Sequence, residues 1–464
     1  MVPAALCLAL IQGPPPETAS KIVAAHEWVV RLGRDMGDSI WPGFRPDTIP
    51  VVYVVRGQGT LLLGWRGGLP EGFLPIAGVA GSGWLSSADR GAASTGTELA
   101  GRPTAQVVVI DSLGVASLVG LTTHEAFHVF EVAAKKEGRR FGRGENSFLV
   151  TSYPVFDPQN EAGMALEGRI LAAAEQAEAK VRKRALARQF LAVRESRQRA
   201  LGAELADFEQ LTELNEGLAE YTLVRVLALA ARRRDFPDRA GAVRLQSSKL
   251  TGLHKLTEDV TRSIRLRYYA TGPALGLLLD ALEGPAWKTQ LMNQNLTVQD
   301  ALADASGYRS QEFALRRQAE STFVIAKLRT AADSGVAGLR AFRRAQVDSV
   351  LAAPGVQLVV IVEGRLGMCG IDPQNLLQVE PGVLLHTRWL QACAGDAFQA
   401  TFNTPVVQDH AAQTLRAVVG ADSTVQVTTG AAGDVRIESP LVSLRAAKAD
   451  VSRDGRVLTV KIKN

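Results

Sequence analysis

The order of apolar and polar positions divides the first part of the chain into alternating helices and strands. Residues 20–41 carry apolar side chains at helical spacing, and the turn-forming sequence Trp-Pro-Gly closes the segment. Two β-branched runs, 51–55 and 107–110, predict buried strands on either side of a loop over residues 64–102 that is rich in Gly, Ser and Thr. A helix over residues 117–136 follows. These elements predict a small α/β subdomain over residues 20–160.

The composition shifts at residue 161 to Ala, Leu, Glu, Arg and Gln, with no proline before residue 235. This pattern is typical of long amphipathic helices that pack on one another. Residues 247–350 continue as helices, and we expect breaks at Gly272-Pro273, at Gly284-Pro285 and at Gly307. A mainly helical subdomain is therefore predicted over residues 161–350.

The character of the chain changes again after Pro354. Short runs of β-forming residues at 356–362, 386–389, 398–402 and 457–462 are separated by Gly, Asp, Asn and Pro. We expect a β-rich domain over residues 351–464, which makes the whole chain an α+β protein.

Composition narrows the classes of protein only slightly. The chain of 464 residues is 46% hydrophobic and 21% charged with a net charge of +5, which excludes a wholly disordered or fibrous protein. Arginine runs at 182–184 and 232–234 lack interleaved aromatic residues, so they indicate solvated helix faces and no nucleic-acid partner is expected. A helical protein that binds RNA or DNA is the weaker alternative, and it predicts salt-dependent affinity. No apolar run reaches the 18 or more residues of a transmembrane segment.

The cysteines and the N-terminus leave the cellular compartment open. Cys369 and Cys393 could form one bridge in an oxidising compartment, but three cysteines in all are too few for a disulfide scaffold. Residues 2–11 have the length of a signal-peptide apolar region but no positive segment before them. Residues 1–19 are thus a signal peptide, which implies a secreted or periplasmic protein, or a disordered terminus, which allows a cytoplasmic one.

The strongest chemical signal is the sequence His124-Glu125-Ala-Phe-His128. On a helix, residues four apart share a face, so both imidazoles can bind one metal ion. Zinc lowers the pKa of a bound water toward about 7, and a carboxylate beside the first ligand can take the proton of that water. The motif predicts a zinc site with Glu125 as general base.

A catalytic zinc site needs a third protein ligand, and no histidine follows His128 at the metzincin spacing. The segment Asn-Glu-Gly-Leu-Ala-Glu places Glu216 and Glu220 four residues apart on one helical face. One carboxylate of such a pair can bind the metal while the other accepts the free N–H of a ligating imidazole. Glu213 is a further candidate ligand, although together with Glu209 it fits a solvated face. Small residues at Gly217 and Ala219 would let this helix approach the first one closely.

Together these segments resemble the gluzincin metallopeptidases, the group that includes thermolysin-like and aminopeptidase N-like enzymes. The resemblance implies a zincin-like fold and a Zn²⁺ cofactor. It implies His124, His128 and Glu216 as the metal ligands, Glu125 as general base, and Glu220 as the support of a zinc-binding histidine.

The sequence Tyr268-Tyr269-Ala-Thr-Gly-Pro is similar to a segment of aminopeptidase N-like enzymes that opens a helix. In those enzymes a tyrosine of this segment donates a hydrogen bond to the tetrahedral oxyanion. The resemblance implies this role for Tyr269, with Tyr268 as the neighbour that could replace it. A phenol aimed at a developing negative charge would complement zinc. Two tyrosines that only pack at the start of a helix would show the same pattern.

Two departures limit the resemblance, which covers about residues 105–305. His128 and Glu216 are 88 residues apart, much farther than in the two named groups, and no Gly-x-Met-Glu-Asn segment precedes the zinc motif to hold a substrate amine. The predicted function is a zinc metallopeptidase that binds a peptide or protein along the edge of the sheet containing residues 107–110. The alternative is a catalytically inactive, zincin-like binding protein. Endo- or exopeptidase specificity and oligomeric state stay open.

Overall fold

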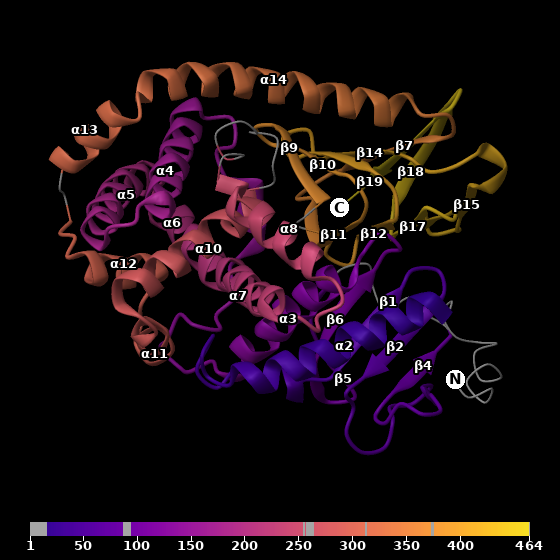
Figure 1. The fold of residues 1–464 in the computed structure, drawn as a ribbon. Helices are drawn as coiled ribbons and strands as arrows, with labels where there is room; N and C mark the ends of the chain where they lie inside the picture. The colour runs from indigo at the N-terminus through magenta and orange to yellow at the C-terminus, as the bar shows by residue number, and fades with distance from the viewer. Residues whose placement is uncertain are drawn as a thin grey trace. The chain divides into compact units, whose positions relative to one another are not determined.

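The computed structural model describes residues 16–86, 94–253, 256, 264–310, 313–372 and 375–463. It is a mixed α+β structure with three sheets and a β-rich C-terminal region (Figure 1). The chain forms two compact units. The first unit comprises Met1–Glu145, Gly163–Thr257 and Arg265–Ile325, and the second comprises Asn146–Ala162, Glu258–Ile264 and Ala326–Asn464. Of the expected N-terminal signal, residues 1–15 lie outside the described part, and residues 16–19 begin a helix.

The first unit contains a six-stranded sheet with the order β3-β4-β2-β1-β6-β5. β1 and β6 are parallel and the other neighbours are antiparallel. The run 51–55 forms the fully buried β1 as predicted, but the loop expected over 64–102 is wrong in part, because short strands in it pair with neighbours. The strands are β1 (Val51–Val55), β2 (Gly59–Leu63), β3 (Leu74–Pro75), β4 (Gly83–Leu85), β5 (Thr95–Leu99) and β6 (Arg102–Val109).

Helices make up the rest of the first unit, in agreement with the predicted helical composition. The break expected at Gly272-Pro273 is wrong, because α10 continues through Pro273. Gly284 and Gly307 do follow helix ends, and both have positive φ angles (66° and 69°). The helices that lie wholly or mostly in this unit are α2 (Pro16–Met36), α3 (Val115–Ala133), α4 (Pro158–Gln176), α5 (Lys180–Leu201), α6 (Ala203–Thr212), α7 (Leu218–Arg232), α8 (Arg239–Leu250), α10 (Ile264–Glu283), α11 (Ala286–Asn293), α12 (Val298–Ser306) and α13 (Phe313–Thr322).

Helix α3, which carries the His-Glu-x-x-His motif, begins without a cap of its own. Its N-cap residue is Gly114, which has no side chain to accept the free N–H groups. Asp238 supplies the missing acceptor from far along the chain, because its Oδ2 accepts from the Ala116 amide at 3.0 Å. Its Oδ1 accepts from the Gly241 amide at 3.1 Å and so caps α8 as well. One carboxylate therefore fixes the starts of two helices.

The second unit is a sandwich of two sheets. One sheet has the order β18-β19-β7-β14-β13-β10-β9, and the other has the order β15-β16-β17-β12-β11-β8. The strand expected over 386–389 is wrong, because His386 ends β10 and β11 begins only at Leu390. The strands are β7 (Gln357–Val362), β8 (Gly367–Ile371), β9 (Leu376–Glu380), β10 (Val383–His386), β11 (Leu390–Ala394), β12 (Phe398–Phe402), β13 (Val406–Asp409), β14 (Thr414–Val418), β15 (Gln426–Thr429), β16 (Val435–Glu438), β17 (Val442–Ala446), β18 (Ala449–Asp454) and β19 (Val457–Ile462).

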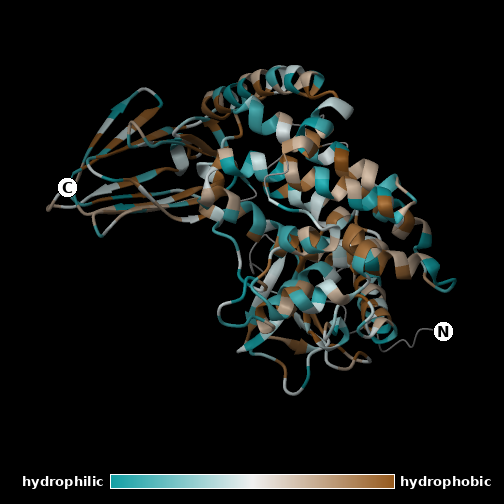
Figure 2. Ribbon diagram, turned by 90° about the vertical axis from the view of Figure 1, so that its left-hand side faces the viewer, coloured by the Kyte–Doolittle hydropathy of each residue, from teal (hydrophilic) through white to brown (hydrophobic). Residues whose placement is uncertain are grey.

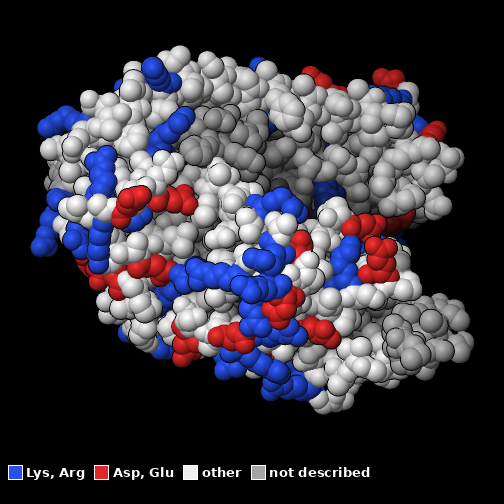
Figure 3. Space-filling view, in the orientation of Figure 1, with Lys and Arg blue, Asp and Glu red and all other residues white. Residues whose placement is uncertain are grey.

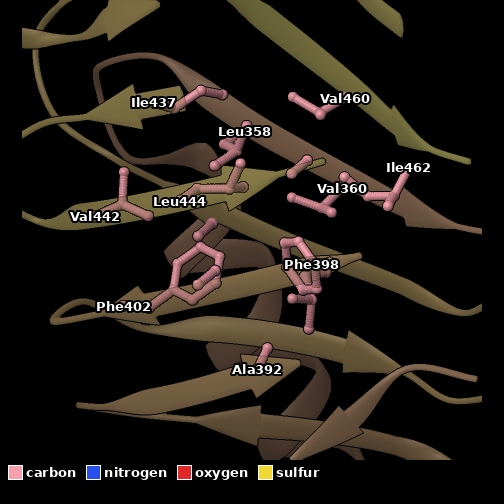
Figure 4. Packing of buried hydrophobic residues seen from close by; sticks show 14 of the residues in the cluster. Leu358, Val360, Ala392, Phe398, Phe402, Ile437, Val442, Leu444, Val460 and Ile462 are labelled. Carbon is pink, nitrogen blue, oxygen red and sulfur yellow. The ribbon is translucent and has the colours of Figure 1, made fainter. Parts of the chain in front are cut away.

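Alternate apolar side chains of both sheets form the core of this sandwich. Leu358 and Val360 of one sheet and Phe398, Phe402 and Leu444 of the other belong to one buried cluster (Figure 4). Buried positions alternate with exposed ones along β16 and β17 and with half-buried ones along β7, as expected where one face of a sheet packs against another sheet.

The long helix α14 (Ile325–Ala352) covers the other face of the seven-stranded sheet. Val347, Val350 and Leu351 of this helix pack against a small buried cluster that includes Val379 and Leu385. Hydrophobic and hydrophilic positions alternate along the helix, as expected of a helix with one face on a sheet (Figure 2).

A disulfide joins Cys369 on β8 to Cys393 on β11, and their Cα atoms lie 5.9 Å apart. The two strands are antiparallel neighbours, and β8 is the outermost strand of its sheet. The bond therefore attaches an edge strand covalently to the rest of the sandwich.

Acidification is expected to destabilise the second unit through the buried His386. Its Nε2 lies 2.9 Å from Gln408 Oε1, whereas its Nδ1 is buried without a hydrogen-bond partner among the described residues. Burial lowers the pKa of His386 from 6.5 to about 4. Between pH 6.5 and pH 4, His386 therefore binds a proton in the unfolded chain but stays neutral in the folded chain. The free energy of unfolding should fall by about 3 kcal/mol over this range.

Urea unfolding at several pH values would measure this loss, with His386→Gln as the comparison because glutamine does not titrate. Carboxylates contribute equally to both proteins, so the difference between the two pH profiles isolates the histidine. Identical profiles would contradict the expectation.

Among the described residues, no helix combines the length and the apolar character needed to cross a bilayer.

Charged side chains of both signs are interspersed on the face shown in Figure 3. One arginine of the run 232–234, Arg233, forms ion pairs with Asp35 at 2.6 Å and with Asp235 at 3.2 Å.

Candidate metal centre

Three of the residues singled out in the sequence meet in the first unit. His124 Nε2 and His128 Nε2 lie 3.1 Å apart, and Glu216 Oε2 lies 3.4 Å from the first and 3.6 Å from the second. Ligand atoms that each lie 2.0–2.1 Å from one tetrahedral zinc ion are about 3.3 Å from one another. The three atoms thus form a triangle of the size that one zinc ion requires. A search of the described residues for three or more His, Cys, Asp or Glu side chains close enough to share a metal ion finds this group.

The outward-facing nitrogen of each imidazole is bonded to a carboxylate. His124 Nδ1 lies 3.1 Å from Glu220 Oε2, and His128 Nδ1 lies 3.2 Å from Glu131 Oε2. A carboxylate acceptor keeps the proton on Nδ1, so both Nε2 lone pairs point to the centre of the triangle. Glu220 occupies the place that the resemblance implies. Glu131 was missed, although its position three residues after His128 puts it on the same helical face.

A π-helical turn, η4 (Glu213–Gly217), separates the glutamates of this region into two pairs. In a regular α-helix Glu209, Glu213, Glu216 and Glu220 would all lie within about 60° on one face. The extra residue in a π turn rotates the second pair away from the first. Glu216 and Glu220 therefore reach the imidazoles, while Glu209 and Glu213 turn toward arginines of α5.

The expectation that Glu209 and Glu213 form a solvated face is wrong. Both are buried, and their oxygens lie 2.6 Å from guanidinium nitrogens of Arg197 and Arg194 respectively. Glu213 also accepts a hydrogen bond of 2.6 Å from the Thr271 hydroxyl. These contacts place Glu213 in a buried ion-pair network and not among the candidate ligands.

The carboxylate of Glu216 has different partners on its two oxygens. Arg265 Nη2 donates to Oε1 at 2.5 Å, whereas the Tyr269 hydroxyl donates to Oε2, the oxygen that faces the imidazoles. Arg265 is a residue that sequence reasoning missed, because it lies 49 positions away and belongs to no motif.

Tyr269 and Tyr268 are placed very differently. Tyr269 stacks on the His124 ring with 5.5 Å between ring centroids, so its hydroxyl lies at the triangle. Tyr268 is fully buried, and its backbone carbonyl lies against Gly217. Both lie in the first turns of α10. The structure thus brings Tyr269 to the cluster, as the alignment of the motif implies.

Glu125 is buried on α3 beside the two imidazoles, and none of the hydrogen bonds among the described residues involves its carboxylate. Burial raises its pKa above the usual range, while the imidazoles of His124 and His128 oppose that rise. A desolvated carboxylate with a raised pKa is a stronger proton acceptor than one in water, which is the property of a general base.

The surrounding carboxylates favour positive charge at the centre of the cluster. Burial opposes the charged form of His124, but hydrogen bonds to Glu216 and Glu220 outweigh it and raise its pKa to about 9. Burial likewise raises the pKa of Glu216, and its bonds to both imidazoles reverse the effect and hold it well below the usual range. Burial raises the pKa of Glu131 to about 7.

Close contact between helices depends on two glycines. A Cβ atom at Gly272 of α10 would lie 2.2 Å from the Cα of Gly217 and 2.4 Å from its carbonyl oxygen. Gly217 therefore permits the approach of α10 and its Tyr269, and not that of α3 as expected. Between α3 and α7, Gly120 packs against Leu223.

β5 is the edge strand of the sheet and lies beside α3. A Cβ atom at Gly96 would lie 3.4 Å from the Cβ of His128. Residues 107–109 belong to β6, which pairs with β1 along residues 105–109 and with β5 along residues 102–106. Within the described part of the chain, no strand pairs with the outer side of Thr95–Leu99.

Comparisons of the chain with protein-family models, with curated proteins and with solved structures found no match. The likeness to gluzincins thus rests on the short motifs and on the geometry of the residues that they contain.

Proposed function

We propose that the first unit is a zinc-dependent metallopeptidase of gluzincin type with a zincin-like fold. The observation that carries this proposal is the triangle of His124 Nε2, His128 Nε2 and Glu216 Oε2, with sides of 3.1, 3.4 and 3.6 Å. Two imidazole nitrogens and one carboxylate oxygen are a donor set that zinc prefers, and three protein ligands leave a fourth position open.

Bound zinc would supply a Lewis acid that activates water and polarises the scissile carbonyl. Glu125 takes a proton from water as the water oxygen bonds to the carbonyl carbon, and it gives that proton to the amide nitrogen as the C–N bond breaks. Tyr269 would turn its hydroxyl from Glu216 to the carbonyl oxygen as negative charge develops there. Glu220 and Glu131 hold the two imidazoles in the required tautomer.

An extended peptide or protein segment is the substrate that the neighbouring sheet edge fits. No strand among the described residues pairs with the outer side of β5, and its backbone groups there can hydrogen-bond to such a segment as an added strand. Because β5 lies beside His128, a peptide bond of the added strand would pass near the triangle. The Cys369–Cys393 disulfide supports a secreted or periplasmic location, where such bonds persist.

Zinc stoichiometry of the Glu216→Ala variant tests the third ligand. Wild-type protein should bind one zinc ion per chain, and the variant should lose tight binding because two imidazoles alone do not hold the ion. The measurement is metal content after dialysis against a weak chelator. Glu204→Ala, an exposed glutamate of α6, is the matched control and should bind zinc as the wild type does.

Unchanged zinc binding in Glu216→Ala would overturn the proposed donor set. One zinc ion per chain without hydrolysis of any member of a peptide library would favour the alternative, a zincin-like binding protein.

A further inference from the structure

A charged side chain outside the motifs controls how Glu216 faces the triangle. The side chain of Arg265 is 12% exposed, and its Nη2 makes two contacts, one of 2.5 Å to Glu216 Oε1 and one of 2.6 Å to Glu145 Oε1. The Glu145 carboxylate is 2% exposed, and its other oxygen accepts a hydrogen bond of 2.8 Å from Asn215 Nδ2.

These contacts form a closed ring. Asn215 and Glu216 are neighbours in the chain, and Glu145 and Arg265 connect the side chain of one to the side chain of the other. All four residues belong to the first unit. Because the ring contains two carboxylates and one guanidinium, loss of the cation would leave two buried negative charges next to each other, which is costly.

The ring divides the two oxygens of Glu216 between different tasks. Oε1 forms an ion pair with Arg265, and Oε2 is the oxygen that faces the imidazoles. A carboxylate that offers one oxygen suits the four-coordinate geometry of zinc, whereas one that offers both is typical of larger ions with more ligands, such as Ca²⁺.

We propose that Arg265, held by Glu145, is a positioning residue that makes Glu216 a one-oxygen ligand and thereby sets the affinity and coordination number of the bound metal. This inference rests on the proposed metal site, and it assigns to Arg265 and Glu145 a role that no motif indicates.

Metal binding by Arg265→Gln tests the inference without any measurement of hydrolysis. Zinc affinity, measured by competition with a chelator, should fall about 10- to 100-fold, which is the usual effect of removing a group that orients a metal ligand. The Co²⁺-substituted variant should show weaker visible absorption than the wild type, because release of Oε1 allows a higher coordination number.

Two further variants separate positioning from general damage. Arg265→Lys should restore most of the affinity and the wild-type Co²⁺ spectrum, since a single nitrogen makes both contacts in the native protein. Glu145→Gln should weaken zinc binding less than Arg265→Gln does. Arg225→Gln is the matched control, because Arg225 pairs with Asp280 and touches none of the four ring residues.

The outcomes distinguish this inference from the proposed function. If Arg265→Gln folds and keeps zinc affinity within twofold and the wild-type Co²⁺ spectrum, the inference is wrong while the metal site stands. If Arg265→Gln does not fold, unchanged affinity and spectrum in Glu145→Gln would overturn it. If wild-type protein binds no zinc, the inference and the proposed function fail together.

Discussion

Glu125→Gln is expected to slow peptide hydrolysis by about 10²- to 10⁴-fold, the usual contribution of a general base. Glutamine has nearly the same shape as glutamate but cannot take a proton from the attacking water. The substitution should cost little stability, because the Glu125 carboxylate makes no hydrogen bond among the described residues. Zinc content should also stay at the wild-type value, because Glu125 is not part of the triangle of donor atoms.

Hydrolysis of casein and of a fluorogenic peptide library would measure the effect. Glu204→Gln, at an exposed position of α6, is the matched control and should retain full activity. Undiminished hydrolysis by Glu125→Gln, with zinc bound, would reject Glu125 as the base and leave the metal site untouched.

Glu167→Gln should lower the free energy of unfolding of the first unit by about 3–5 kcal/mol, the cost of removing one partner from a buried ion pair. Glu167 Oε2 accepts from Arg194 Nε at 2.9 Å, and Oε1 accepts from Arg197 Nε at 2.6 Å. The side chains of all three residues are at most 5% exposed. Glutamine would remove the charge that two buried guanidiniums share and would present an N–H group to one of them.

Urea unfolding of the full chain would measure this loss, followed by a probe of the helical unit such as far-ultraviolet circular dichroism. Asp235→Asn is the control, because its partners Arg31 and Arg233 are exposed and such surface pairs contribute about 1 kcal/mol or less. A loss below about 1 kcal/mol for Glu167→Gln would show that the network contributes no more than a surface pair.

Local sequence patterns predict much of this fold and part of the site. The strand at 51–55 and the helix around His124 can be predicted from the pattern of apolar side chains alone. A fully buried strand and the buried face of a helix both require apolar residues at those positions. The pair Glu216 and Glu220 follows from helical spacing. Glu131 could have been predicted in the same way, since it lies one turn after His128.

Features that depend on contacts between distant segments could not be predicted from the sequence. The π turn at 213–217 has no local signal, so Glu209 and Glu213 were expected to face solvent. The dipeptide Gly272-Pro273 normally ends a helix, yet α10 continues through it, and Gly272 packs on Gly217. Arg265 lies 49 positions from Glu216, so no local pattern predicts their contact.

The π turn η4 also makes the site sensitive to the length of the chain at this point. A protein that lacked Leu214 alone would form a regular helix here with Glu216 and Glu220 still facing away from Glu209, because the π turn accommodates one extra residue. Loss of a second residue would have no such compensation and would rotate the segment that carries Glu216 by about 100° about the helix axis. The spacing between the arginine network and the imidazoles is therefore constrained to within one residue.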